Sequence, residues 1–376
     1  MIVPPLPVSI LIDGVQLVGW TSYTITPSSL LEPVGAFELV MPFNKQAWDL
    51  VETEARCQIA LGGVIVMTGI VEEADGDEQI MVRGRSLVGR LVQESAPSLR
   101  FEGLSLSQLV AKLAAPWFSS VTLSNERNRR LIRGKGRKVA AATEPLRIDP
   151  AKGGAVAEPG QMRWTVIQEL LRQAGCLAWS SGDGRELVVG RPNHDQAPQW
   201  RFFNPKAGSA RGAESTVLGM KVRRSTADRY SRVIVTGSGR GTDANYGPAV
   251  AARYGEALDG PGAEGVGGDF AEPKRLVIHE PVRSIDEARQ IARQELARRA
   301  AHATVVECSA PGHGQVVLPG LPPTIFCADT IASVEDERTG TRGPFLVAGC
   351  TFKSDRSGGE VTDLQLLRRG VELAAS

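Results

Sequence analysis

The sequence predicts an α+β, mainly β fold, in which two small β-barrel domains bracket a helix-plus-hairpin α+β module. Three observations support this prediction. The 376 residues include 41 Gly and 23 Pro, which favour turns and short strands over long helices. Short strand-like segments fill both ends of the chain, whereas capped amphipathic segments interrupt them. A chain of this length is expected to form about two to four domains.

Residues 1–96 are predicted to form the first β-barrel domain. The segment VSILIDGVQLVGW alternates apolar residues and turns at Asp13-Gly14, which is a hairpin signal. Strand-like segments continue as far as LVGRLVQES, with turns at Gly62-Gly63 and Asp75-Gly76. Short strands separated by polar turns indicate a small barrel or sandwich, so we expect β structure throughout this region.

Residues 97–195 are predicted to form the α+β module, which begins with a short helix. In the segment LSLSQLVAKLAAPW, Ser105 and Gln108 have capping-box spacing. Apolar residues follow at helical intervals, and Pro116 ends the pattern. The sequence therefore predicts an amphipathic helix that stops before this proline.

A second helix and a hairpin complete the predicted module. The helix is expected to begin at Thr165, with Gln168 as its capping partner, and to end at Gly175. The following segment, CLAWSSGDGRELVVG, has two apolar runs around a Gly-Asp-Gly turn at 182–184. This arrangement predicts a β-hairpin.

Residues 196–376 are predicted to form the second β-barrel domain, with one long interruption. The glycine-rich insertion 241–273 has too few large apolar residues for a core of its own, so we expect a long mobile loop. A third capped helix is predicted over 284–302, with Ser284 and Glu287 as the capping pair. The remaining segments, including TVVECSA and GPFLVAGCTFKSD, are strand-like.

The charge of the chain is balanced overall but strongly positive in one short run. There are 43 Lys and Arg against 42 Asp and Glu, which gives a net charge of +1. A basic run without any acid occupies residues 127–138, and two glycines interrupt it. A short run of this kind is typical of a solvated loop or of a contact with an acidic partner. Its cations are Arg127, Arg129, Arg130, Arg133, Lys135, Arg137 and Lys138.

The sequence predicts neither a metal site nor a disulfide framework. The five cysteines are dispersed, odd in number and mostly within apolar strand-like runs, so we expect reduced core thiols. The four histidines lack metal-ligand spacing, and His313, between two glycines, is expected to be a loop histidine. No apolar run approaches the roughly 18 residues of a membrane span, and no signal peptide is predicted.

Catalytic and cofactor motifs are also absent from the sequence. The segment VIVTGSGRGTDA resembles a dinucleotide fingerprint, but Thr242 occupies the third glycine position and Pro248 lies where a helix should follow. There is no Walker loop and no Gly-x-Ser-x-Gly elbow. We therefore predict no catalytic residues and no cofactor, and we interpret the chain as a structural or assembly protein.

Several segments, taken in order, resemble the baseplate hub proteins of Mu-like tailed phages. The first domain shows the Gly-Trp, Gly-x-Phe, Gly-x-Val and Gly-Arg-Ser segments of that family, and the helix-hairpin and the final strands also look like it. Residues 125–160 and 241–273 match no part of the family. The matching motifs of the first domain are Gly19-Trp20, Gly35-Ala36-Phe37, Gly69-Ile70-Val71 and Gly84-Arg85-Ser86.

The resemblance implies a hub similar to that of T-even phages and to the N-terminal part of type VI secretion spike proteins. Three copies, each with two tube-like barrels, would form a pseudo-sixfold ring that joins the hexameric tail tube to the trimeric central spike. The implied partners are two further copies, the spike, a tail tube or distal tail protein, and baseplate wedge or other tail proteins. The implied location is the virion tail or baseplate, after assembly in the host cytoplasm. The genome would pass through the ring without sequence-specific binding.

Two other functions remain open at the level of the sequence. A nucleic-acid-binding module would rest only on the basic run 127–138, and a gel shift at two salt concentrations would detect it. A tail-associated cell-wall hydrolase would need a catalytic constellation, which zymography on peptidoglycan would reveal.

Replacement of the seven cations of the basic run by Ser or Gln tests the nucleic-acid hypothesis. We expect weakened or unchanged assembly, because the run is predicted to contact an acidic neighbour or solvent. We expect no sequence-specific DNA complex from the unaltered chain. A salt-dependent, sequence-selective complex in a gel shift would contradict this interpretation.

Overall fold

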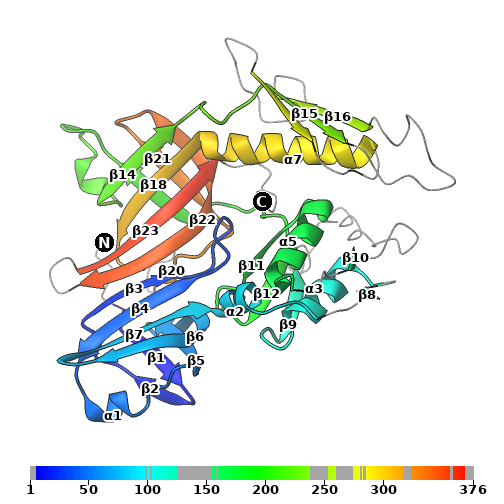
Figure 1. The fold of residues 1–376 in the computed structure, drawn as a ribbon. Coiled ribbons are helices and arrows are strands. Elements are labelled where there is room, and N and C mark those ends of the chain that lie inside the picture. Colours follow the sequence, from blue (N-terminus) through cyan, green and yellow to red (C-terminus); the bar gives the residue numbers. More distant parts are fainter. Residues whose placement is uncertain are drawn as a thin grey trace, which may run out of the picture.

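The fold is mainly β with a few helices, which confirms the predicted class. The computed structural model describes residues 6–97, 100–101, 104–124, 155–156, 160–237, 253–259, 274–279, 282, 285–316, 323–355 and 359–368. Figure 1 shows strands from both ends of the chain at the left, with α1 at their lower end, α2, α3 and α5 to the right and α7 across the top.

The first β region consists of the strands β1 to β7, with a short helix between β4 and β5 and another helix after β7. Its strands pair in the order β2-β1-β5-β6-β7-β4-β3, and every pairing is antiparallel. The strands are β1 (Val8–Ile12), β2 (Val15–Leu17), β3 (Ser22–Thr26), β4 (Ala36–Pro42), β5 (Arg56–Leu61), β6 (Val64–Gly76) and β7 (Gln79–Ser86). The helices are α1 (Lys45–Trp48) and α2 (Leu87–Gln93).

The second β region consists of strands from two separate parts of the chain. Its pairing order is β14-β18-β23-β22-β21-β13. The strands are β13 (Trp200–Asn204), β14 (Gly219–Arg224), β18 (Thr304–Pro311), β21 (Thr330–Asp336), β22 (Thr341–Asp355) and β23 (Gly359–Arg368). A 3-10 turn (Gly212–Glu214) and a separate two-stranded pair, β19 (Gly314–Gln315) with β20 (Thr324–Ile325), complete it.

The two β regions form one continuous sheet, because β3 of the first pairs with β22 of the second. Tyr23 lies opposite Ser354, and Ile25 lies opposite Phe352. Among the described residues, the strand pairing runs through both regions and does not close either one on itself. The two predicted barrels are therefore joined edge to edge by main-chain hydrogen bonds.

One apolar core extends through both β regions. The first region contributes buried side chains such as Ile10, Ile25 and Ile59, and the second contributes Phe202 and Phe352. All five of these side chains are essentially inaccessible to solvent. Separation of the two regions would expose part of this core, so the hydrophobic effect favours the joined arrangement.

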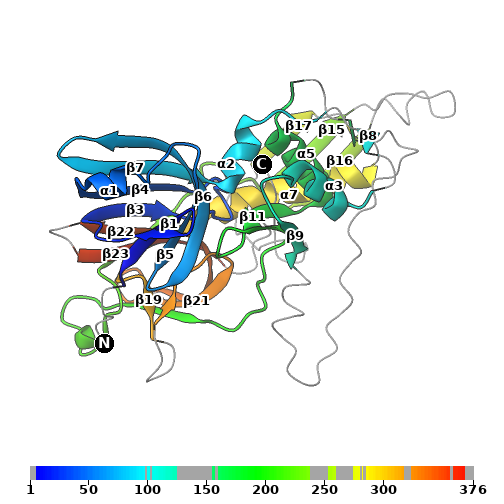
Figure 2. The ribbon, with the colours of Figure 1, turned by 90° about the horizontal axis from the view of Figure 1, so that it is seen from below.

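The α+β module lies beside the sheet (Figures 1 and 2). In its small sheet, β11 and β12 form the predicted hairpin, and β9 adds to β12 in parallel. The capping box of Ser105 and Gln108 is present at the start of α3, as predicted. The elements are β8 (Arg100–Phe101), α3 (Leu106–Ala114), β9 (Ser120–Leu123), β10 (Ala155–Val156), α5 (Arg163–Ala174), β11 (Leu177–Ser180) and β12 (Glu186–Gly190).

Both faces of the small sheet are buried, which explains its almost continuous apolar strands. Leu187 and Val189 pack with α2, α3 and α5. Trp179 and Val188 instead pack against Leu346 and other apolar residues of the second β region. The module is thereby attached to the large sheet through an apolar contact. Because Leu87, Val88 and Leu91 of α2 join the same cluster as α3 and α5, this helix also packs with the module.

A separate α7 unit projects from the second β region (Figure 1). It consists of α7 (Ile285–Ala303) and a three-stranded sheet of β15 (Arg232–Gly237), β16 (Arg253–Leu258) and β17 (Arg275–His279), with β15 in the centre. Val233 and Val235 of β15 face Ala288 and Ala292 of α7 in a small core. The chain then runs from α7 directly into β18.

Two predicted elements in the first half of the chain differ from the structure. The segment LVGRLVQES, predicted as a strand, forms the helix α2, because Leu87, Val88 and Leu91 lie on one helical face and are buried. The second helix of the module begins at Arg163, with Met162 at its N-cap and no side-chain cap, so the predicted start at Thr165 is wrong. Trp164 extends the buried apolar face by one turn toward the N-terminus.

The prediction that the glycine-rich insertion 241–273 forms a long mobile loop is also wrong in part. Part of this insertion forms β16, whose small residues Gly255 and Ala257 face α7. A Cβ atom on Gly255 would lie 2.2 Å from backbone atoms of the helix, so the helix approaches this strand too closely for larger residues. The helix predicted over 284–302 is observed at Ile285–Ala303. The predicted cap residue Ser284 lies outside the described residues.

All five cysteines are free, and three of them are buried, as predicted for core thiols. Burial raises the pKa of the Cys57 and Cys308 thiols to about 12, so both remain protonated at neutral pH. No helix in the described part of the chain combines the length and the apolar character needed to cross a membrane.

The substitution Gly84→Ala is expected to destabilise the first β region. A Cβ atom at Gly84 would lie 2.1 Å from the carbonyl oxygen of Ile70 and 2.5 Å from the ring of Phe37. Overpacking of this kind costs about 1–3 kcal/mol. The free energy of unfolding, measured by urea denaturation, should decrease by this amount.

Gly219→Ala is the matched control for this substitution. Gly219 also lies in a strand, but no atom lies within 4 Å of the position that its Cβ would take. We expect unchanged or slightly increased stability. Equal stability losses in the two variants would contradict the close packing at Gly84.

Candidate functional site

A buried polar cluster lies at the seam between the two β regions. The hydroxyl of Tyr23, from the first region, lies 2.7 Å from Nε2 of His313. Nδ1 of His313 lies 2.9 Å from the hydroxyl of Thr362, which donates to the carbonyl oxygen of Gly312. Since this threonine proton is committed to a carbonyl, Nδ1 of His313 donates and Nε2 accepts from Tyr23. Every polar atom of the imidazole is therefore satisfied in the neutral form.

The surroundings of His313 strongly disfavour its protonated form. Its side chain is completely buried, and burial lowers the pKa of His313 to about 4. Burial and the nearby Glu360 carboxylate raise the pKa of Tyr23, and burial also raises that of Glu360. Glu360 accepts a hydrogen bond from the backbone nitrogen of Leu6 at 3.1 Å. The cluster thus links the start of the chain, β3 and β23, and it has the properties of a structural tie.

The prediction that His313 is a loop histidine is correct for its place in the chain but not for its surroundings. His313 does lie in the short connection after β18, but it is a core residue rather than an exposed loop residue. Its ring also makes an edge contact with Phe352, with centroids 5.2 Å apart. The flanking glycines gave no indication of this burial, because the covering residues come from distant parts of the chain.

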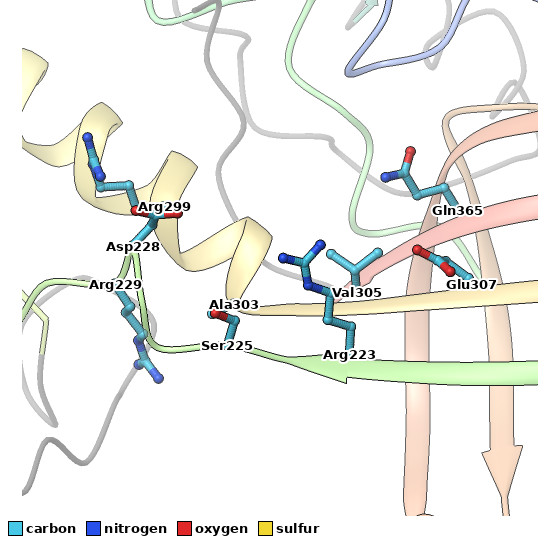
Figure 3. Close-up of a pocket in the computed structure, with 9 residues that line it drawn as sticks. All are labelled: Arg223, Ser225, Asp228, Arg229, Arg299, Ala303, Val305, Glu307 and Gln365. Atoms are coloured by element: carbon cyan, nitrogen blue, oxygen red, sulfur yellow. The ribbon is translucent and has the colours of Figure 1, made fainter.

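A surface pocket of about 250 Å³ lies where the end of α7 meets β14, β18 and β23 (Figure 3). Three arginines line it, but two of them are already neutralised. Arg229 pairs with the buried Asp259 at 2.9 Å, and Arg299 pairs with Glu295 at 2.6 Å. The third, Arg223, lies on β14 next to Val305, and within the described part of the chain its guanidinium forms no hydrogen bond or ion pair.

A broader groove of about 670 Å³ continues from this pocket across the same face of the sheet and shares Glu307 and Gln365 with it. Three of the charged side chains that line it, Lys221, Glu307 and Asp363, form ion pairs across adjacent strands. Lys221 lies 3.3 Å from Glu307, and Lys353 lies 2.8 Å from Asp363. An open surface of this kind, with mixed polar and apolar lining and mostly paired charges, suits contact with another protein better than capture of a small charged ligand.

The residues proposed from the sequence as a partner contact, namely the basic run 127–138, lie outside the described residues. The structure instead brings together Arg223, Arg229 and Arg299, which the sequence interpretation did not single out. Two of them occur in the segment KVRRSTADR, so its density of cations was a visible signal. The third comes from α7, and only the fold places it nearby.

The described residues contain no group of three or more His, Cys, Asp or Glu side chains that could hold a metal ion. His313, the buried histidine of the seam, has Tyr23 and Thr362 as its hydrogen-bond partners. Because it is inaccessible to solvent and held neutral, it is poorly suited to general base catalysis on an external substrate.

Comparison with known families shows which family the first β region is similar to. Residues 7–90 match the family model described as Mu phage baseplate assembly protein GpP-like, N-terminal. This match confirms the resemblance to Mu-like baseplate proteins that the sequence motifs indicated. No curated protein matches the sequence.

The fold of nearly the whole chain is similar to solved tail proteins. A tail protein from Neisseria meningitidis MC58 is 22% identical, with a TM-score of 0.74 and 98% of each chain covered. The 43 kDa tail protein of prophage MuSo2 from Shewanella oneidensis is 21% identical, with a TM-score of 0.71, and covers 97% of this chain and 99% of that one.

A more distant structure has the same overall arrangement. The E. coli c3393 protein, a component of the type VI secretion system described as similar to T4 tail proteins gp27 and gp5, is 9% identical. Its TM-score is 0.53, with coverage of 97% of this chain and 78% of that one. Together, the family model and the shared fold support a structural role in a phage tail or baseplate.

Acidification is expected to weaken the fold through His313. Below about pH 6.5 the unfolded chain binds a proton at this histidine that the folded chain excludes until about pH 4. Stability should therefore be intact above pH 6.5 and decrease as the pH falls, by about 1.4 kcal/mol per pH unit from this residue. The raised pKa of Glu360 acts in the opposite direction and reduces the net slope.

His313→Gln isolates the contribution of the histidine, because Gln can form hydrogen bonds but does not titrate. We expect the variant to be less stable than the unaltered chain at pH 7, with a smaller further loss between pH 6.5 and pH 5. Urea denaturation at both pH values measures this difference. Parallel pH dependence in the two proteins would contradict the assignment.

Proposed function

We propose that this chain is a structural hub of a phage baseplate, which forms a trimeric, pseudo-sixfold ring between the hexameric tail tube and the trimeric central spike. The observation that carries the proposal is the combination of the family match over residues 7–90 with a shared fold over 97–98% of the chain. In this proposal the protein has no catalytic role and needs no cofactor.

The joined β regions support the pseudo-sixfold part of the proposal. Each chain carries two mainly antiparallel β units that continue one another through the pairing of β3 with β22. Three chains would then present six such units around one axis. Because each chain would contact two neighbours through different surfaces, the contacts would be heterologous and closed.

We further propose three domains, as the sequence suggests: a tube-like barrel at 1–96, the α+β module at 97–195 and a second barrel at 196–376. The partners would be the spike, a tail tube or distal tail protein, and baseplate wedge or other tail proteins. Assembly would occur in the host cytoplasm, and the genome would pass through the ring without sequence-specific binding. The basic run would contact an acidic neighbour.

The molar mass of the purified chain tests the central claim. Light scattering over a concentration series should reveal a trimer, and negative-stain imaging should show a ring with a central hole. The candidate spike protein, added in excess, should bind with a stoichiometry of three chains to one spike trimer. A chain that stays monomeric both alone and with the spike would contradict the proposed function.

A further inference from the structure

Among the described residues, no helix or strand packs on one face of the three-stranded sheet of the α7 unit. The sheet of β15, β16 and β17 has α7 on one side, where Leu276 and Ile278 of β17 pack toward the helix. On the other side, Val277 is 53% exposed and Leu258 is 51% exposed. Val277 lies opposite Ile234 of the central strand, and Leu258 lies opposite Arg232, two residues away on the same strand. Ile234 is buried, so the exposed apolar side chains of this face are Leu258 and Val277.

The open face is basic as well as apolar. Arg232 is paired with Glu256 at 2.6 Å and contributes no net charge. Arg275 lies on the same face of β17 as Val277 and is exposed, and nothing in the described residues forms an ion pair with it. His279, two residues further along β17, is also exposed. A partner for this face should combine apolar side chains with carboxylates.

The chain itself has a surface with these properties at the tip of the first β region. Phe43 is 45% exposed and Leu50 is 37% exposed, on either side of α1. The backbone nitrogen of Phe43 donates to the carbonyl oxygen of Glu78 at 3.1 Å, so the acidic turn of β6 and β7 lies beside this aromatic ring. Asp77 and Glu78 are exposed, and within the described residues their carboxylates have no ion-pair partner. We call this surface the α1 tip.

The open face and the α1 tip lie at opposite ends of the molecule. Figure 1 places α1 at the bottom and β15 and β16 at the top, and Figure 2 places them at the left and right ends. The two surfaces therefore cannot meet within one chain. Two complementary patches at different places on the same protein are what a head-to-tail contact between copies requires.

We propose that the open face of the α7 unit in one copy binds the α1 tip of the next copy. Leu258 and Val277 then cover Phe43 and Leu50, and Arg275 lies opposite Asp77 and Glu78. This inference rests on the proposed ring and assigns the surfaces that hold it together. Its occupant is a second copy of this chain because the complementary charge and apolar side chains are both present in the chain.

Single substitutions at each surface test the contact. Val277→Glu on the open face and Phe43→Ser on the α1 tip should each raise the concentration needed for trimer formation by about tenfold or more, because each removes an apolar contact. Val64→Glu is the matched control. Val64 is 55% exposed and begins β6, at the end of that strand away from the α1 tip. It should leave trimer formation unchanged.

Charge reversal distinguishes a lost contact from a damaged fold. Arg275→Glu should weaken the trimer, and the same substitution combined with Asp77→Arg and Glu78→Arg should restore it. Light scattering and sedimentation velocity of all variants measure the effect. A combined variant that stays dissociated would overturn the pairing of these two surfaces.

The mass of the unaltered chain distinguishes a failure of the assigned surfaces from a failure of the proposed ring. If it forms a trimer and Val277→Glu and Phe43→Ser leave that trimer unchanged, the assigned surfaces are wrong while the ring stands. If the unaltered chain is monomeric alone and with the spike, both proposals fail.

Discussion

The structure depends on the pairing of β3 with β22, which joins residues near the start of the chain to residues near its end. Three residue pairs connect the strands, and the buried hydrogen bond between Tyr23 and His313 lies beside them. A shared core of residues such as Ile25 and Phe352 covers the inner side of the seam. Main-chain, polar and apolar interactions thus act at one place. Together they offset the entropic cost of closing the long loop between β3 and β22.

The α+β module and the α7 unit are both attached to this joined sheet. The α+β module is held by the contact of Trp179 and Val188 with the second β region. The α7 unit is held differently, since its helix continues directly into β18, and the connection that enters from β14 is fixed to the end of β16 by the pair of Arg229 and Asp259. The first attachment is apolar and the second is mainly covalent and ionic, so we expect the α7 unit to adapt its position more readily than the module.

Local patterns predicted much of the fold, and distant contacts account for the failures. The capping box of Ser105 and Gln108 and the hairpin at 182–184 depend on neighbours in sequence, and both are present. The strand β16 was not predicted, because Gly255 and Ala257 lack the large apolar side chains that indicate a strand. They are small because a helix about 30 residues later packs closely against this strand. The burial of His313 was missed for the same reason, since Tyr23 covers it from the other end of the chain. The seam and the surface pocket could not be predicted, because no local signal specifies which edge strands meet.

The joined sheet also constrains how a ring of these chains could close. In the proposed pseudo-sixfold ring, the seam between the two β units within a chain alternates with the contact between neighbouring chains. The first contact is fixed by the buried seam, with His313 held neutral inside it. Because the seam fixes the orientation of the two β units within a chain, only the contact between neighbouring chains depends on exposed surfaces. Exposed contacts with apolar centres and a few charges can form after each chain has folded, so folding and closure of the proposed ring would be separate steps. In the proposed assembly, the buried seam therefore stabilises the single chain, and the exposed end surfaces determine which partners it joins.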